Sequence, residues 1–476
     1  MNIGKMLLFM AAVLIGLGCI SAIFPSEGIL LTDSTTITFP SLSEVLATEE
    51  TKESKPQTVQ AEEQKEELSP EEILALREKA IQNDSTYVDF MKNNPARVYM
   101  PTDDYLDPFF EKLEVAKETG VRVMHYGDSQ IEMDRMSSFL REKWQTSFGG
   151  CGVGFMPAVQ TVATTTISQS INPKLRQYIP YGDASMRSKE GNYGPMARSA
   201  AIEGNVTFTC RKVSSPNAPE HAGKFTTLTV IAKGDVNAVC HAADSTIKMT
   251  NVSKDDAIKI LTAKFNKQAE TATINLSGKG HIYGISADGG KGVMVDNVPM
   301  RGCSGTIFGN IREADLKAYY NHFNVGLIIL QYGGNAVPYL RSDKGISIFK
   351  DQIKNTISLF KRIVPNSCIM LIGPSDMATK NGGTPHTYDR LPQVVDSLRA
   401  AAIESDVAFW DLFASMGGEG SMVKWVDTGL AGGDYLHFST KGAEKAAEML
   451  YNTLHFIQSH RSKAKKSVEK DLKKAK

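Results

Sequence analysis

Short runs of apolar residues, many of them β-branched, alternate with amphipathic segments along much of this chain. The apolar runs have the length of buried strands and lie at residues 121–126, 292–298, 325–331, 368–372 and 407–412. Helical periodicity with one apolar face marks the segments 136–144, 346–360, 391–403 and 441–457. Short strands that alternate with helices predict a parallel sheet covered on both faces, which is a three-layer α/β architecture.

Residues 161–285 break this rhythm. The segment is rich in Thr, Ser, Asn and Gly, contains short alternating runs and shows no long helical period. We therefore expect an inserted all-β domain, a small sandwich or jelly roll, between the first and second strands of the α/β domain. Two roles are open for it: a carbohydrate-binding face, or a structural cover for the catalytic domain.

The N-terminus carries a long apolar stretch. Residues 6–24 contain no charge, which is about the length that crosses a bilayer core. Lys5 precedes the stretch and the next basic residue is Lys52, so we expect the remainder of the chain outside the cytoplasm. Residues 1–28 are then an uncleaved anchor in the inner membrane, a cleaved signal peptide, or a leader for lipid attachment at Cys19. All three place the body at the periplasmic face.

Polar segments flank the predicted domains. Residues 29–100 are expected to be a linker and a short helix, which begins at the capping-box sequence Ser69-Pro-Glu-Glu72. Residues 459–476 form a basic tail, predicted to be a solvated, frayed end.

Charge and cysteine usage narrow the function classes. Lys plus Arg and Asp plus Glu both total 53, so we expect no nucleic-acid partner. Five cysteines follow Cys19, and this odd number leaves at least one free thiol. Cys210 and Cys240 lie in one β-rich region and are candidates for a disulfide, whereas Cys368 is expected in the core. No metal-ligand spacing is present, and we predict neither a metal nor a cofactor.

The candidate chemistry lies at the end of the first strand. Gly127-Asp-Ser129 follows an apolar run and precedes a helical pattern, which puts a serine at a strand's carboxyl end, where open parallel sheets bind ligands. Far downstream the chain has Asp434-Tyr-Leu-His437. A serine paired with a late Asp-x-x-His is a candidate nucleophile with its base.

Two further blocks join these motifs: Tyr332-Gly-Gly-Asn-Ala336 and Val293-Met-Val-Asp-Asn-Val-Pro-Met-Arg-Gly302. Along the chain the four blocks lie at residues 127–129, 293–302, 332–336 and 434–437. With the blocks in this chain order, the sequence resembles the SGNH (GDSL-type) hydrolase superfamily, in a carbohydrate-esterase-like branch with an inserted β domain. The resemblance covers residues 101–160 plus 286–458 and implies a flavodoxin-like parallel sheet.

The resemblance implies a role for each matching residue. Ser129 attacks an ester carbonyl, His437 acts as base and then acid, and Asp434 orients the imidazole. The oxyanion is expected to meet the Ser129 N–H, the Gly302 N–H and the Asn335 side-chain amide; Gly305 is the alternative to Gly302. Asp128 is expected to hydrogen-bond locally, and Asp376 to serve loop structure.

Three functions are consistent with these sequence features. The first is a serine esterase that removes O-acetyl groups from an extracytoplasmic polysaccharide through an acyl-enzyme. The second is an O-acetyltransferase that passes the acetyl group to a glycan, helped by a membrane acyl-transfer partner. The third is a glycan-binding protein with a vestigial site.

Overall fold

The computed structural model describes residues 29–32, 35–37, 68–214, 219–380 and 383–475, which form two units split near residue 66. The first unit contains an antiparallel hairpin of β1 (Ile29–Thr32) and β2 (Thr35–Ile37). The predicted anchor at residues 6–24 and most of the predicted linker lie outside the described residues. Within the described ranges, no helix is both long enough and apolar enough to span a membrane. The second unit, residues 67–476, is called the main unit below.

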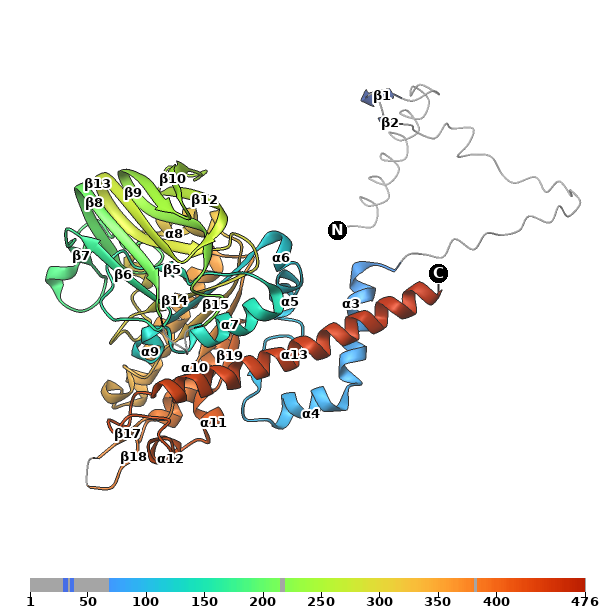
Figure 1. The fold of residues 1–476 in the computed structure, drawn as a ribbon. Helices are drawn as coiled ribbons and strands as arrows, with labels where there is room; N and C mark the ends of the chain where they lie inside the picture. Colours follow the sequence, from blue (N-terminus) through green and yellow to red (C-terminus); the bar gives the residue numbers. More distant parts are fainter. Residues whose placement is uncertain (1–28, 33–34, 38–67, 215–218, 381–382, 476) are drawn as a thin grey trace, which may run out of the picture. The chain divides into compact units, whose positions relative to one another are not determined.

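A six-stranded sheet lies at the centre of the main unit (Figure 1). Its strand order is β14-β4-β15-β16-β19-β3. The first five strands are parallel, and β3 pairs antiparallel with β19. Their bounds are Val293–Pro299 (β14), Val121–Gly127 (β4), Val325–Gln331 (β15), Cys368–Ile372 (β16), Ala408–Trp410 (β19) and Val98–Tyr99 (β3). The five predicted strands and their parallel arrangement are confirmed.

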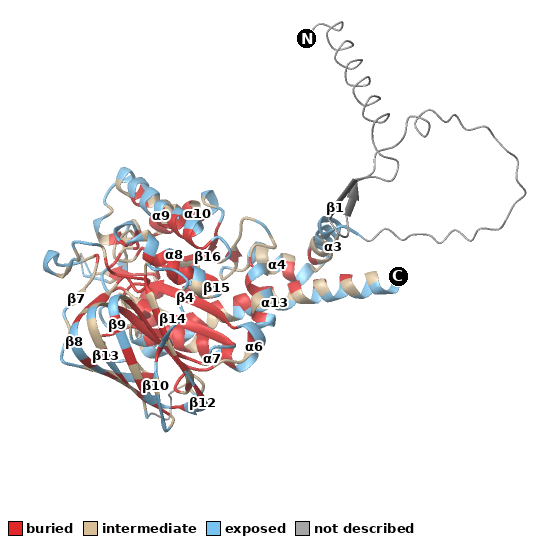
Figure 2. Ribbon diagram, turned by 90° about the horizontal axis from the view of Figure 1, so that it is seen from above, coloured by how far each residue is buried: buried red, intermediate tan, exposed pale blue. Residues whose placement is uncertain are grey.

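Helices cover both faces of this sheet. One hydrophobic core contains Met124 and Tyr126 of β4, and the other contains Val121 and Val123, because alternate residues of a strand face opposite sides. The first core is closed by α8 (Glu313–His322), α9 (Asp343–Ile363) and α10 (Leu391–Glu404). The second is closed by α5 (Asp107–Glu114), α7 (Ser137–Phe148) and α13 (Thr440–Ala475). Figure 2 shows the parallel strands buried between the helices, so the three-layer prediction is confirmed.

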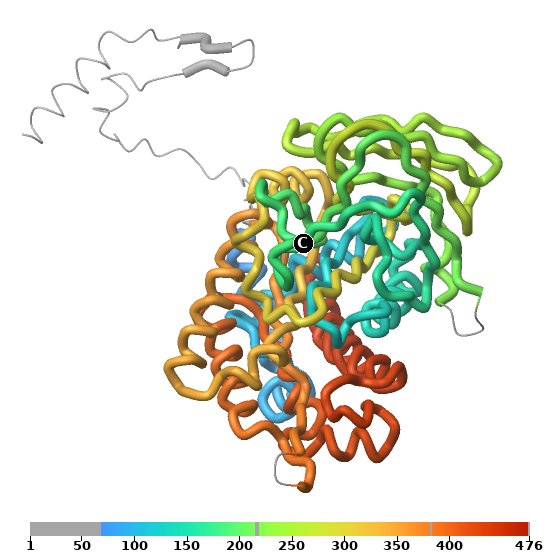
Figure 3. Tube along the Cα trace, turned by 90° about the vertical axis from the view of Figure 1, so that its left-hand side faces the viewer, coloured from blue at the N-terminus to red at the C-terminus, as the bar shows by residue number. Residues whose placement is uncertain are grey.

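A nine-stranded antiparallel sheet is built from the segment between β4 and β14. Its main order is β11-β12-β9-β13-β8-β6, and β5, β7 and β10 pair at its sides. The strands are β5 (Gly154–Met156), β6 (Ile167–Asn172), β7 (Gln177–Tyr178), β8 (Ser199–Lys212), β9 (Phe225–Ala242), β10 (Ser245–Lys248), β11 (Thr250–Asn251), β12 (Lys259–Ala269) and β13 (Thr271–Asp288). In Figure 3 this sheet, green to yellow, lies at one end of the main unit. The β-rich segment is confirmed, whereas an independent domain with two packed sheets stays a prediction.

Buried charges join the two sheets. Arg122 on β4 donates to Asp296 on β14 at 2.6 Å and to Asp288 at the end of β13 at 2.9 Å. All three side chains are at most 6% exposed. The antiparallel sheet is therefore fixed to the parallel sheet through the end of β13.

Both ends of the main unit are helical. The predicted capping box begins α3 (Pro70–Gln82), where the Glu72 N–H donates to Ser69 Oγ at 3.2 Å; α4 (Ser85–Asn93) follows. The basic tail is not frayed, because α13 continues to Ala475. Arg461 is buried in that helix and donates to Glu78 and Asp107, at 2.6 and 2.5 Å.

The described cysteines are all buried and unbridged. The predicted Cys210–Cys240 disulfide is wrong, because the two residues lie on β8 and β9, which flank β13 on opposite sides. Two strand spacings separate the Cα atoms by roughly 9–10 Å, beyond the reach of a disulfide. Cys368 lies in the core on β16, as expected.

Short elements complete the main unit. They are α6 (Ala116–Thr119), η1 (Ser129–Asp134), η2 (Ala184–Met186), η3 (Phe308–Asn310), η4 (Val337–Tyr339), β17 (Ala378–Thr379), β18 (His386–Thr387), α11 (Leu412–Met416) and α12 (Ser421–Asp427).

Candidate active site

The carboxyl ends of three neighbouring parallel strands meet at one edge of the sheet. Gly127 of β4 lies opposite Gln331 of β15, which lies opposite Ile372 of β16. The loops that leave these strands therefore lie side by side. They carry Ser129 and Asn335 into one cavity of about 160 Å³. An open parallel sheet is expected to bind ligands at this edge.

Hydrogen bonds join the three predicted catalytic residues in a chain. The Nδ1–H of His437 donates to Asp434 Oδ2 at 2.8 Å, which leaves Nε2 as the acceptor. Ser129 Oγ lies 2.9 Å from that Nε2 and donates a hydrogen bond to it. The side chains of His437 and Asp434 are 44% and 48% exposed, so solvent reaches the imidazole directly.

The carboxyl of Asp434 is held in its ionised form. Its partial burial alone raises the pKa, but the hydrogen bonds from the His437 imidazole and from the backbone N–H groups of Leu436 and His437 outweigh this effect. The pKa of Asp434 is therefore below its ordinary value. An ionised carboxylate at this position fixes the tautomer of His437 and stabilises its cation.

Two residues that the sequence did not single out join two segments of the site. One segment is the loop before α13 that carries His437, called the histidine loop below, and the other is η1, called the serine turn. Gln130 Nε2 donates to the carbonyl of Leu436 at 2.6 Å, and the N–H of Phe438 donates to Gln130 Oε1 at 3.1 Å. One amide thus binds the backbone on both sides of His437. Arg135 donates to the carbonyls of Phe438 at 2.5 Å and Ser129 at 3.0 Å, which joins the same two loops again.

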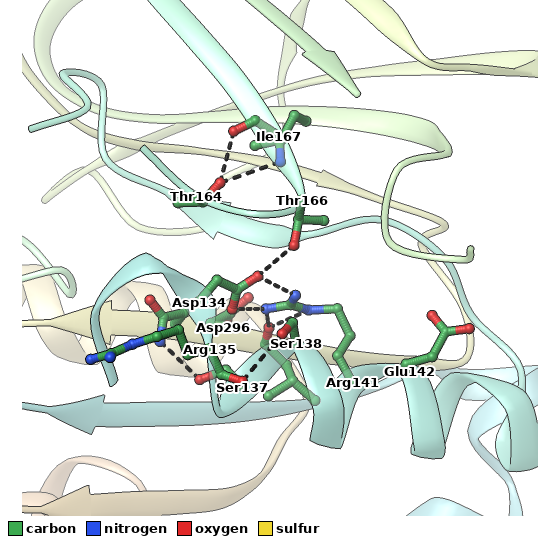
Figure 4. Close-up of polar contacts among 12 residues, drawn as sticks. Asp134, Arg135, Ser137, Ser138, Arg141, Glu142, Thr164, Thr166, Ile167 and Asp296 are labelled. Atoms are coloured by element: carbon green, nitrogen blue, oxygen red, sulfur yellow. Dashed lines mark hydrogen bonds and ion pairs between the residues drawn. The ribbon is translucent and has the colours of Figure 1, made fainter. Parts of the chain in front are cut away.

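The far end of the serine turn is held by a buried ion pair. Met133 and Asp134 have φ values of 62° and 64°, a conformation that L-residues rarely adopt. Figure 4 shows Arg141 of α7 meeting the Asp134 carboxylate, with N–O distances of 2.6 and 2.9 Å. Thr166, next to β6 of the antiparallel sheet, donates to the same carboxylate at 2.9 Å. The insertion therefore contributes to the position of the serine turn.

Of the predicted oxyanion donors, Ser129 and Asn335 line the cavity, whereas Gly302 does not. Ser129 is the first residue of η1, so its N–H has no partner within that turn. Asn335 lines the cavity, and its Nδ2 donates to Asp128 Oδ2 at 2.9 Å and to the carbonyl of Cys303 at 3.2 Å. Gly302 is exposed and does not line this cavity, and Gly305 is buried against Tyr332. The structure brings Asn335 to Ser129 but leaves both glycines outside the cavity wall.

Asp128 is buried beneath the serine and makes local hydrogen bonds, as expected. It accepts from the Gln130 N–H at 2.9 Å and from Asn335. Burial raises the pKa of its carboxyl to about 6, although these hydrogen bonds and the nearby His437 oppose the shift. Asp376 is also buried and accepts from the N–H groups of Met377 and Met422, which agrees with a role in loop structure.

No protein-family model matches this sequence, and no curated protein resembles it significantly. Among solved structures, a peptidoglycan O-acetylesterase aligns over 76% of this chain and 99% of its own, at 20% identity and a TM-score of 0.61. A family two carbohydrate esterase from Cellvibrio japonicus aligns over 62% of this chain and 99% of its own, at 10% identity and a TM-score of 0.25. The second likeness is too low to add to the first.

The sheet order, the serine turn after β4 and the Asp-x-x-His before α13 agree with the resemblance seen in the sequence blocks. The first of these solved structures aligns with this fold over nearly its whole length. The chain therefore has the fold of the SGNH hydrolase superfamily.

Proposed function

We propose that this protein is a serine esterase that removes O-acetyl groups from a polysaccharide. The observation that carries the proposal is the hydrogen-bonded chain Ser129–His437–Asp434 at the mouth of a small cavity. A hydroxyl becomes an effective nucleophile when a positioned base takes its proton. The position and tautomer of His437 suit that task.

In the first half of the reaction, Ser129 Oγ attacks the ester carbonyl while its proton passes to His437 Nε2. The negative charge that develops on the carbonyl oxygen is met by the Ser129 N–H and the Asn335 amide. Such a donor is worth about 3–4 kcal/mol in the transition state. Both hydrogens of Asn335 Nδ2 already have acceptors, which are Asp128 Oδ2 and the carbonyl of Cys303. The amide must therefore give up the longer bond, to Cys303, when it donates to the oxyanion.

In the second half, His437 donates its proton to the leaving sugar oxygen, and the C–O bond breaks to leave acetyl-Ser129. Water then attacks the acetyl group as His437 accepts a proton from it. Acetate leaves, and His437 returns the proton to Ser129 Oγ. The exposure of His437 favours water over a sugar hydroxyl as the acceptor, and so favours hydrolysis over transfer.

The substrate class rests on two supports. A peptidoglycan O-acetylesterase is one of the solved structures that align over most of the chain. The apolar stretch at residues 6–24 is predicted to place the body outside the cytoplasmic membrane, where acetylated polysaccharides occur. The tether and the membrane acyl-transfer partner remain predictions from the sequence.

The test measures acetate release by the purified protein from an O-acetylated polysaccharide and from a small acetate ester. We expect Ser129→Ala to lower kcat by at least ~1,000-fold on both, while Ser459→Ala, an exposed serine of α13, leaves it unchanged. Equal activity of Ser129→Ala and the wild type refutes the serine mechanism. Mass analysis that finds acetyl groups on an added oligosaccharide, rather than free acetate, identifies a transferase instead.

A further inference from the structure

One aromatic ring stands out on the surface of the main unit. Tyr339 is 80% exposed, whereas the other exposed large apolar residues in the described part of the chain reach 51% at most. Within the described ranges, no hydrogen bond or ring contact involves its side chain. Single exposed apolar residues are common on protein surfaces, so it is the position of this ring that gives it meaning.

Tyr339 lies at the mouth of the catalytic cavity. It ends η4, four residues after Asn335, and together with Pro338 it lines the same cavity as Ser129 and His437. This exposed aromatic ring therefore lies on the loop after β15, and not on the inserted sheet.

The backbone beneath this ring is well fixed. The N–H of Tyr339 donates to the carbonyl of Ala336 at 2.9 Å, and its own carbonyl accepts from the Arg341 N–H at 3.1 Å. Val337, two residues earlier, is buried in the core. A ring held on a rigid turn loses little conformational freedom when it binds a ligand.

The size of the cavity decides which part of the substrate meets the ring. About 160 Å³ accommodates an acetyl group and its ester linkage, but it is well below the roughly 300 Å³ or more of pockets that enclose whole ligands. The sugar that carries the ester must therefore lie at the mouth. A pyranose ring has an apolar face of C–H groups, which suits the negative face of an aromatic ring.

We propose that Tyr339 and Pro338 form a sugar subsite, on which the pyranose ring that carries the acetyl ester stacks. The proposal rests on the esterase function and adds the group that selects a glycan over a small ester. The ring contacts the sugar both before and during the reaction, so it contributes to substrate binding more than to the chemical step.

The experiment compares Tyr339→Ala, Tyr339→Phe and Tyr339→Trp on an O-acetylated polysaccharide and on ethyl acetate, whose alcohol has no ring to stack. We expect Tyr339→Ala to raise KM for the polysaccharide about tenfold with kcat within twofold. Its kcat/KM for ethyl acetate should be unchanged, and both aromatic variants should behave as the wild type does. The control is Ile348→Ala, which removes another half-exposed apolar side chain, on α9.

Binding is measured separately, so that failure of the esterase function and failure of the subsite are distinguishable. In a Ser129→Ala background, Tyr339→Ala should weaken calorimetric binding of the acetylated polysaccharide about tenfold, whether or not the wild type hydrolyses it. Unchanged affinity overturns the subsite. An equal loss of activity on both esters also overturns it, because the ring then supports the fold. A changed sedimentation coefficient with unchanged binding identifies a contact between copies instead.

Discussion

At the scale of single residues, the proposed reactivity of Ser129 depends on which atoms of its neighbours carry protons. The Asp434 carboxylate keeps the Nδ1–H of His437 in place, so the lone pair of Nε2 faces the serine hydroxyl. Asp128 lies beneath the same serine, but its carboxyl is buried, and its pKa is raised to about 6. The two carboxylates therefore respond in opposite directions to their surroundings, and each leads to a separate prediction.

Replacing Asp434 with asparagine should abolish most activity and leave the fold intact. The amide cannot stabilise the imidazolium, and it can hold the wrong tautomer by donating to Nδ1. We expect kcat to fall roughly 10,000-fold. The melting temperature should stay within a few degrees, because Asp434 is half exposed. A kcat within tenfold of the wild type contradicts the role of this carboxylate.

The Asp128→Asn variant should flatten the dependence of stability on pH. The pKa of Asp128 is about 6 in the folded protein and about 3.9 in an unfolded chain, so the folded state binds this proton more tightly. Stability from this group is greatest below pH 4 and is lost as the pH rises to about 6. The loss is on the order of 3 kcal/mol.

Urea unfolding at pH 4 and pH 7 measures this effect. The difference between the two free energies of unfolding should shift by about 2 kcal/mol in Asp128→Asn relative to the wild type, because this group is already about half ionised in the unfolded chain at pH 4. The exposed Asp256→Asn serves as the control, and its difference should match that of the wild type. An unchanged difference in Asp128→Asn contradicts the raised pKa.

At the scale of elements, η1 carries Ser129 and Gln130, and Arg135 follows directly at its end. Gln130 binds the backbone on each side of His437, and Arg135 binds the same loop from the other end of the turn. The distance between Ser129 and His437 thus depends on two loops separated by about 300 residues. Neither Gln130 nor Arg135 needs to touch the reacting atoms, so both are positioning residues.

The Gln130→Ala variant tests this arrangement. We expect kcat to fall about 100-fold because His437 loses two backbone contacts, while KM changes less than threefold. Gln130→Glu keeps the acceptor for the Phe438 N–H but cannot donate to the Leu436 carbonyl when ionised. The ratio of its kcat to the wild-type kcat at the same pH should therefore rise as the pH falls. Circular dichroism checks that both variants are folded. An unchanged kcat in Gln130→Ala removes the positioning role.

The sequence was most informative where periodicity is strong. Val325–Gln331 and the apolar face of α9 were predicted from spacing alone, because burial imposes a regular pattern on strands and helices. It was least informative about contacts between distant segments. Nothing near Arg135 indicates that it meets Phe438, and only the order of strands shows that β13 separates Cys210 from Cys240. The aromatic ring of Tyr339 was also missed, since exposure is not visible in one sequence.

At the scale of the whole main unit, buried charges connect parts that composition alone separates. Asp134 joins the serine turn to Arg141 and Thr166, and Arg122 joins both sheets through Asp296 and Asp288. A buried ion pair is costly to break, because the remaining charge is left without a partner. The antiparallel sheet and the parallel sheet should therefore unfold together.

The Arg122→Met variant should weaken that coupling. Methionine fills similar space but leaves the carboxylates of Asp296 and Asp288 unpaired, so the free energy of unfolding should drop by about 3–5 kcal/mol. Lys279→Met, which removes an exposed pair with Glu203, should cost at most about 1 kcal/mol.

Two probes follow the two sheets separately in the same urea titration. The three tryptophans of the chain, Trp144, Trp410 and Trp425, lie in α7, β19 and α12, so their fluorescence reports the parallel-sheet part. Hydrogen exchange along β8 and β9 reports the antiparallel sheet.

In the wild type both probes should give one transition at the same urea concentration. In Arg122→Met both should move to lower urea, and exchange in β8 and β9 should precede the fluorescence change, because the antiparallel sheet then loses its buried attachment. Separate transitions in the wild type contradict a single cooperative unit and indicate that the insertion folds as a domain of its own.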